Sequence, residues 1–87
     1  MKRDFDYYIA EAYKAEQRSN GLWRGINQCI RSVLEVQKRK GTSLNKVPAI
    51  LEYIAGPKKK RQGDMVSINN LRIAAKQIRA GAELVLI

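Results

Sequence analysis

Apolar residues recur at helical spacing in two stretches of the first forty residues. In the first stretch they fall at positions i, i+3, i+4, i+7 and i+8, and they are Phe5, Tyr8, Ile9, Ala12 and Tyr13. This spacing predicts one buried face of a helix, which Asp4 or Asp6 can cap. A broader apolar face follows, made of Leu22, Trp23, Ile26, Cys29, Ile30, Val33, Leu34 and Val36. Its width predicts a second helix from about Leu22 to Lys40 that contacts two neighbours and stops at Gly41.

Two shorter patterns predict a third and a fourth helix. Pro48 has no N–H and is tolerated in a first helical turn, so the third helix should begin near Asn45 or Lys46. Its apolar stripe consists of Val47, Ile50, Leu51 and Ile54. Ser67 is a suitable cap for the fourth helix, which should end before Gly81. The apolar stripe of this helix consists of Ile68, Leu71, Ala75 and Ile78.

These patterns together predict an all-α fold, a small single domain of about four helices over residues 1–87. A chain of this length buries only about 60–65% of its unfolded surface, so we expect a small stability margin. The last residues, Leu84-Val85-Leu86-Ile87, are apolar and should be buried. Three placements are open: a short C-terminal strand pair with Met65-Val66, the core of the chain, or a subunit contact that would make a homodimer.

Positive charge is concentrated in the last two thirds of the chain. The sequence has 17 basic and 8 acidic residues and no histidine, which gives a net charge of +9. Residues 1–21 hold four cations and four anions, whereas residues 22–87 hold thirteen cations and four anions. This distribution is expected if the later elements face a polyanion and the first element does not.

The cations form a pattern that is typical of proteins that bind nucleic acid. A run of four, a helix face of three and the end of the second helix supply ten of the candidate residues, and two asparagines at the start of the fourth helix supply the others. The candidates are Lys58, Lys59, Lys60, Arg61, Arg72, Lys76, Arg79, Lys38, Arg39, Lys40, Asn69 and Asn70.

Within this set, the lysine run is expected to contact phosphates, because flexible cations position a protein on the nucleic-acid backbone. An asparagine can pair with adenine and an arginine with guanine when a helix start enters the major groove. Asn69, Asn70, Arg72 and Lys76 are therefore candidates for reading bases. The alternative interpretation of the two asparagines is that they cap the helix.

The sequence disfavours enzymatic, metal-dependent and cofactor-dependent functions. The absence of histidine removes the commonest general base and metal ligand, and one cysteine provides no ligand set for zinc. No glycine-rich loop of the kind that binds nucleotide phosphates is present. Cys29 is predicted to be an inert core residue, and Trp23 a core aromatic. Tyr7 and Tyr53 are the candidates for exposed aromatic rings.

We therefore expect a non-enzymatic protein that binds nucleic acid, DNA in preference to RNA, as a small regulator of transcription or an accessory factor. One alternative is a protein-interaction module that docks its basic surface on an acidic protein; a second is RNA binding. The charged start Met1–Asp6, with no apolar run after it, predicts a cytoplasmic protein, or a nuclear one in a eukaryote. No stretch approaches the roughly 20 apolar residues that would span a membrane.

Overall fold

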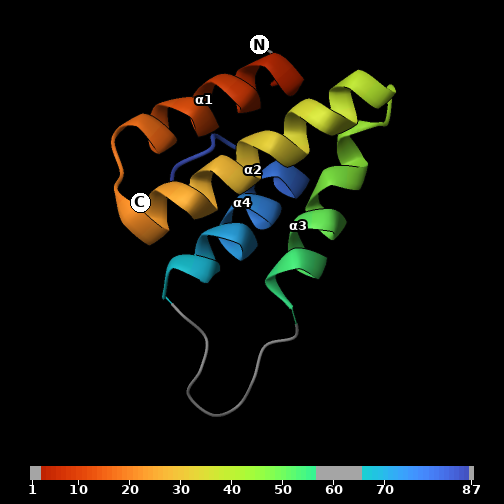
Figure 1. Ribbon diagram of the computed structural model, residues 1–87. Coiled ribbons are helices and arrows are strands. Elements are labelled where there is room, and N and C mark those ends of the chain that lie inside the picture. The colour runs from red at the N-terminus through yellow and green to blue at the C-terminus, as the bar shows by residue number, and fades with distance from the viewer. Residues whose placement is uncertain (1–2, 57–65, 87) are drawn as a thin grey trace.

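The computed structural model describes residues 3–56 and 66–86, and its regular structure there is helical (Figure 1). The four α-helices of these residues are α1 (Phe5–Gln17), α2 (Gly21–Lys40), α3 (Val47–Ala55) and α4 (Asn69–Ala80). Two short 3₁₀ helices, η1 (Leu44–Lys46) and η2 (Val66–Ile68), lead into α3 and α4. No strand occurs among the described residues. The prediction of an all-α fold with four helices is confirmed.

Of the predicted helix-end residues Asp4, Gly41 and Ser67, the first two act as expected and the third does not. The Asp4 carboxylate accepts a hydrogen bond from the backbone N–H of Tyr7 over 3.0 Å and so caps α1. Gly41 ends α2 in the left-handed conformation (φ 77°) that glycine adopts without strain. The exception is Ser67, the predicted cap of α4. It lies in η2, and the backbone passes from η2 into α4 in helical conformation, so no capping residue is used there.

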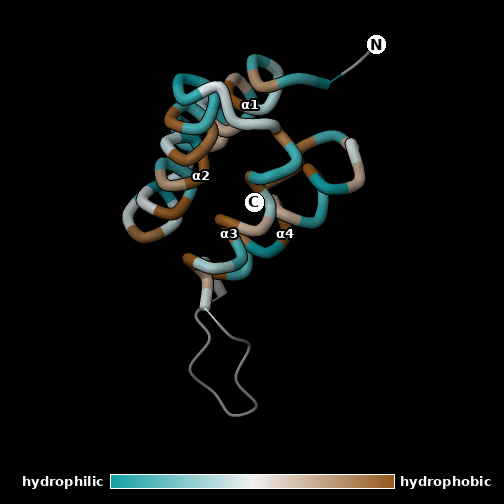
Figure 2. The backbone as a smooth tube through the Cα atoms, turned by 90° about the vertical axis from the view of Figure 1, so that its right-hand side faces the viewer, coloured by the Kyte–Doolittle hydropathy of each residue, from teal (hydrophilic) through white to brown (hydrophobic). Residues whose placement is uncertain are grey.

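The helices form two pairs that share one core. Helices α1 and α2 lie side by side as a hairpin, and α3 packs against α4 (Figure 1). Apolar residues are interspersed with polar ones along the helices (Figure 2), and the buried apolar residues of each helix belong to one common core. The buried cluster draws on all four helices and on the C-terminal tail, and its members are Tyr8, Ala12, Ala15, Ile30, Leu34, Val47, Leu51, Leu71, Ala74, Ala75, Ile78, Leu84 and Leu86.

The C-terminal tail after α4 packs against its own chain. Leu84 and Leu86 are each only 4% exposed, while Val85 between them is 61% exposed. The Tyr8 hydroxyl donates a hydrogen bond to the carbonyl of Ala82 (2.8 Å), and Arg18 donates to that of Leu86 (2.9 Å). Among the placements that the sequence left open, the structure therefore shows burial in the core. The expected partner strand is not formed by Val66, which belongs to η2, and Met65 lies outside the described residues.

Four residues that the apolar patterns predicted to be buried are exposed, and they are Tyr13, Leu22, Ile54 and Val85. Tyr13 is 51% exposed, because the buried face of α1 centres on Tyr8 and the small Ala12 and Ala15, against which α2 packs. Its ring lies under the guanidinium group of Arg31, 5.6 Å from the ring centroid. Ile54 is 45% exposed, because the buried side of the nine-residue α3 is formed by residues at its start and middle.

The other aromatic residues that the sequence analysis singled out, and Cys29, differ in how far they are buried. Tyr53 is 86% exposed, as predicted, whereas Tyr7 and Trp23 are half-buried. Cys29 is also half-buried, and burial raises the pKa of its thiol. None of the helices in the described part of the chain is both long and apolar enough to cross a membrane.

Candidate nucleic-acid interface

Every acidic side chain in the described part of the chain has a partner within the protein. Asp4 caps α1, and the other carboxylates form ion pairs: Asp6 with Lys38, Glu11 with Lys14, Glu16 and Glu35 with Arg31, Glu52 with Arg79, and Glu83 with Arg3. Among the described residues, five exposed cations have neither an ion pair nor a side-chain hydrogen bond. These unpaired cations are Arg24, Arg39, Lys40, Lys46 and Lys76.

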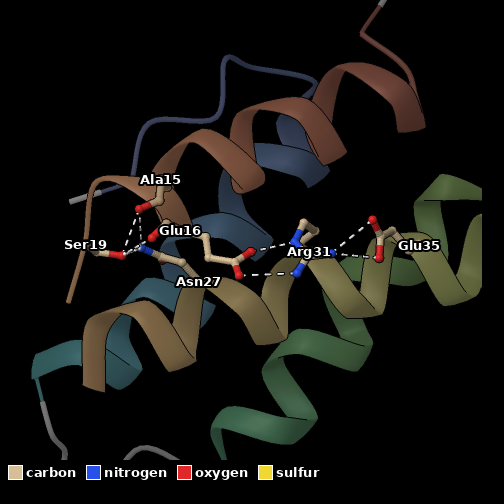
Figure 3. Close-up of polar contacts among 6 residues, drawn as sticks. All are labelled: Ala15, Glu16, Ser19, Asn27, Arg31 and Glu35. Atoms are coloured by element: carbon tan, nitrogen blue, oxygen red, sulfur yellow. Dashed lines mark hydrogen bonds and ion pairs between the residues drawn. The ribbon is translucent and has the colours of Figure 1, made fainter. Parts of the chain in front are cut away.

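Arg31 of α2 forms ion pairs with Glu16 of α1 and with Glu35 of its own helix. Arg31 donates from Nε and Nη2 to the Glu16 carboxylate and from Nη1 to Glu35 (Figure 3). The Glu16 side chain is only 7% exposed, and hydrogen bonding from Arg31 lowers the pKa of its carboxyl. The same contact with Glu16 raises the pKa of Arg31. Arg31 is therefore part of the contact between the two helices and is not available to an external anion.

Two of the three cations predicted on the outer face of α4 are held against α3. Arg79 donates two hydrogen bonds of 2.8 Å to the Glu52 carboxylate and lowers the pKa of that carboxyl. Arg72 donates to Asn69 Oδ1 (2.8 Å) and to the carbonyl of Gly56 (3.2 Å), at the end of α3. Lys76 is the member of this predicted face that is exposed and unpaired. The face thus contributes one unpaired cation to a surface for polyanions.

Asn70 cannot read bases from its position in this structure, and that assignment is corrected. Its side chain is fully buried, and its Nδ2 donates to Asn27 Oδ1 over 3.1 Å. Asn27 in turn donates to the Ala15 carbonyl (3.4 Å) and to Ser19 Oγ (3.3 Å), as Figure 3 shows. Asn70 does not cap α4 either. The reason is its position in the helix, because it precedes Leu71 and lies one turn before Ala74, on the buried face.

The structure reveals Asn27 as a buried polar residue that the sequence analysis did not single out. A usable signal was present: Asn27 lies at i, i+3 and i+7 with Ile30 and Leu34, so it occupies the apolar face of α2. The unpaired cations Arg24 and Lys46 were also missed. Neither belongs to a run of cations, and several of the carboxylates that neutralise other cations are 15 or more residues away in sequence.

The end of α2 carries a second group of unpaired cations. Lys38 is paired with Asp6 of α1, which raises its pKa, but Arg39 and Lys40 are exposed and unpaired. Lys46 follows in η1, which contacts α2. We call Arg39, Lys40 and Lys46 the corner cluster.

The corner cluster and the start of α4 lie at opposite ends of the fold (Figure 1). The described candidates therefore do not form the single surface that the sequence suggested. Lys58, Lys59, Lys60 and Arg61 lie outside the described residues. No group of side chains suited to a metal ion occurs in the part of the chain that the structure describes.

Comparisons of the chain with protein-family models, with curated proteins and with solved structures found no match. The functional argument therefore rests on the residues of this chain.

Proposed function

We propose that this protein binds nucleic acid without catalysing a reaction, and that duplex DNA is its preferred form. The observation that carries the proposal is the pairing of the charges. All described carboxylates are engaged inside the protein, while five exposed cations are not. With a net charge of +9, the molecule has cations that can neutralise phosphates without first breaking an ion pair. Duplex DNA carries about one phosphate charge per 1.7 Å of helix axis, twice the density of one of its strands.

The corner cluster is the strongest part of the proposed interface. It places three unpaired cations within eight residues of sequence, and no acidic residue lies between Arg39 and Lys46. Its position at the end of α2 also compensates the helix dipole, which accounts for one or two cations there. Lys46 lies on η1, outside α2, so compensation of the α2 dipole does not explain its presence.

In this role the protein would act in the cytoplasm, or in the nucleus of a eukaryote, as a regulator of transcription or an accessory factor.

Fluorescence anisotropy with labelled duplex DNA tests the role of the corner cluster. The double variant Arg39→Ala/Lys40→Ala should bind about tenfold more weakly and reduce the salt slope by about two, because each phosphate contact contributes nearly one unit. A matched control is Lys14→Ala/Lys38→Ala, which lowers the net charge by the same amount. It replaces two cations that are paired with Glu11 and Asp6. The control should weaken binding less than threefold. Equal losses in both variants would show that net charge alone matters and that the corner cluster is not the interface.

A second variant tests the run of four cations from Lys58 to Arg61. Lys59→Ala with Arg61→Ala should weaken binding to all DNA sequences alike, because contacts with phosphates carry no sequence information. An unchanged affinity would exclude this run from the interface.

Tyr53 favours a second candidate, RNA or single-stranded nucleic acid. Its ring is 86% exposed, and aromatic rings in such positions can stack on unpaired bases. Competition among duplex DNA, single strands and structured RNA separates the two candidates, and Tyr53→Ala should weaken binding to single strands specifically. If none of the three competitors binds, the alternative of an acidic protein partner is the one to pursue.

A further inference from the structure

One side of α2, at the edge of the bundle, carries an uncharged stripe. Helix α2 lies in front of α4 in Figure 1 and outermost in Figure 2, so this edge is open in both views. Residues along it recur at intervals of three and four with a repeat of seven, which is the seam pattern of paired helices. We call these residues the outer stripe, and they are Leu22, Gly25, Ile26, Cys29, Ser32, Val33 and Val36.

The outer stripe is only partly covered by its own chain. Leu22 is 55% exposed, Gly25 and Ser32 are exposed, and the other four members are half-buried. No charged residue belongs to the stripe, although 29% of the residues in the chain are charged. An uncharged stripe offers no ion pair to a phosphate or to an acidic protein. Its partly exposed apolar side chains therefore favour the uncharged face of another helix as the occupant.

The fold of a single chain does not explain Gly25. Glycine weakens the interior of a helix, and Gly25 is not among the glycines with positive φ. Among the described residues, no atom outside its own helix turn lies within 4 Å of the place that a Cβ would occupy. The missing side chain therefore leaves room outside the chain, where another helix can approach closely.

The outer stripe is complementary to itself when two copies of α2 run antiparallel with their Cys29 residues facing each other. The other facing pairs are then Leu22 with Val36, Gly25 with Val33, and Ser32 with Ile26. Each small residue faces a branched one, so the two surfaces can interdigitate. Every contact occurs twice, as a twofold interface requires. The uncharged stripe also keeps the charges of two copies, each of net charge +9, out of the contact.

We propose that this protein forms an antiparallel homodimer through the outer stripes of two α2 helices, with Cys29 at the twofold axis. The stripe is about 21 Å long at a rise of 1.5 Å per residue. A contact of this length lies at the small end of specific interfaces. We therefore expect a reversible dimer with a dissociation constant of roughly 10–100 µM.

One consequence of the dimer rests on the proposed function. Arg39 follows Cys29 by ten residues, so the two corner clusters begin roughly 30 Å apart, close to the spacing of about 34–36 Å between successive turns of a DNA groove. A variant that breaks the dimer should therefore lose affinity for a duplex of two helical turns and keep its affinity for a duplex of one turn. An equal change on both duplexes would contradict this spacing.

Analytical ultracentrifugation of the full chain, over concentrations that span the expected dissociation constant, tests the dimer. Added salt should shift the equilibrium towards the dimer, because it screens the repulsion between two chains of net charge +9. Ser32→Arg should weaken the dimer about tenfold or more, because it places two cations in the contact. Gln17→Arg adds the same charge at an exposed position of α1, and this control should dimerise as the wild type does. Circular dichroism of each variant checks that it is folded.

Gly25→Ala separates the contact from the stability of the chain. It should raise the free energy of unfolding at concentrations where the protein is monomeric, because alanine favours the helix. It should also weaken the dimer about tenfold, because each added methyl group meets Val33 of the partner subunit. A dimer of unchanged affinity would show that Gly25 does not lie in the contact.

Thiol cross-linking tests the position of the twofold axis, because Cys29 is the one cysteine of the sequence. A short bis-maleimide should join two wild-type chains, and Ser32→Arg should suppress the product. Labelling with a mono-maleimide checks that the thiol reacts in both proteins.

Three results would overturn the proposal. They are a chain that stays monomeric at millimolar concentration in high salt, a dimer that is not cross-linked although the mono-maleimide labels Cys29, and equal weakening by Ser32→Arg and Gln17→Arg. The dimer is measured without nucleic acid, and salt should strengthen it while weakening binding to DNA. Failure of the dimer and failure of the proposed function are therefore distinguishable.

Discussion

At the scale of single residues, the side-chain amide of Asn27 connects three helices. It donates to the carbonyl of Ala15 in α1 and accepts from Asn70 in α4. Both asparagines are completely buried. Burying two amides is costly unless they are hydrogen-bonded, so this pair favours the one packing arrangement that brings the amides together. The hydrogen bonding of this buried region is incomplete, because Asn70 Oδ1 and Ser67 Oγ are buried without a hydrogen-bond partner.

Removing one amide should destabilise the fold. We expect Asn27→Ala to lower the free energy of unfolding by about 1–3 kcal/mol, because Asn70 then loses its partner inside the core. The double variant Asn27→Ala/Asn70→Ala should cost about 1 kcal/mol less than the sum of the single variants, because no amide is left unpaired. Urea denaturation of the four proteins measures this coupling. Additive losses would mean that the two amides do not depend on each other.

Glu16 should contribute to a loss of stability in acid. Its pKa is lowered in the folded state by hydrogen bonding from Arg31, so between this value and the unfolded value of about 4.3 the unfolded state binds more protons. Its contribution to stability is therefore present above about pH 4.3 and is lost as the pH falls through the folded pKa.

Urea denaturation at pH 7 and pH 3 checks this effect. Glu16→Gln should be less stable than the wild type at pH 7 and lose less stability on acidification. Glu11→Gln, which changes a half-buried carboxylate of the same helix that is paired with Lys14, should show the wild-type loss. If Glu16→Gln and the wild type respond equally to acid, the Arg31 contact does not stabilise the folded state.

At the scale of elements, the sequence predicts what depends on local spacing. The apolar periodicity predicts all four helices, and Gly41 and Pro48 predict where α2 stops and where α3 begins. The packing partners could not be predicted in the same way. Glu52 and Arg79 are 27 residues apart, and their ion pair depends on how α3 and α4 lie against each other. The pattern at the start of α4 likewise showed two asparagines but not which of them the core would enclose.

The C-terminal tail acts as a fifth packing element although it forms no helix. Leu84→Ala and Leu86→Ala should each lower the free energy of unfolding by about 2–5 kcal/mol, the usual cost of a cavity at a buried leucine. Val85→Ala, at the exposed position between them, should change it by less than about 0.5 kcal/mol. Thermal or chemical denaturation compares the three variants. Similar effects at all three positions would show that the tail is not docked as described.

At the scale of the whole molecule, α1 supplies counterions for α2. The sequence shows a first segment of zero net charge and a cationic remainder. In the fold, Asp6 and Glu16 of α1 neutralise Lys38 and Arg31 of α2. The electrostatic field of the protein therefore does not follow the net charge of each segment, and the cations that remain unpaired are those assigned to the proposed interface. A homodimer remains a prediction, although the apolar tail that suggested it is buried within one chain.

The most direct test of the account is the affinity of the wild-type protein for random-sequence duplex DNA across a salt titration. We predict micromolar or tighter binding at low salt and a slope of log affinity against log salt of roughly −3 or steeper, as expected if several unpaired cations neutralise phosphates. Absence of binding at low salt, or binding that does not change with salt, would contradict the central claim that the unpaired cations form a nucleic-acid interface.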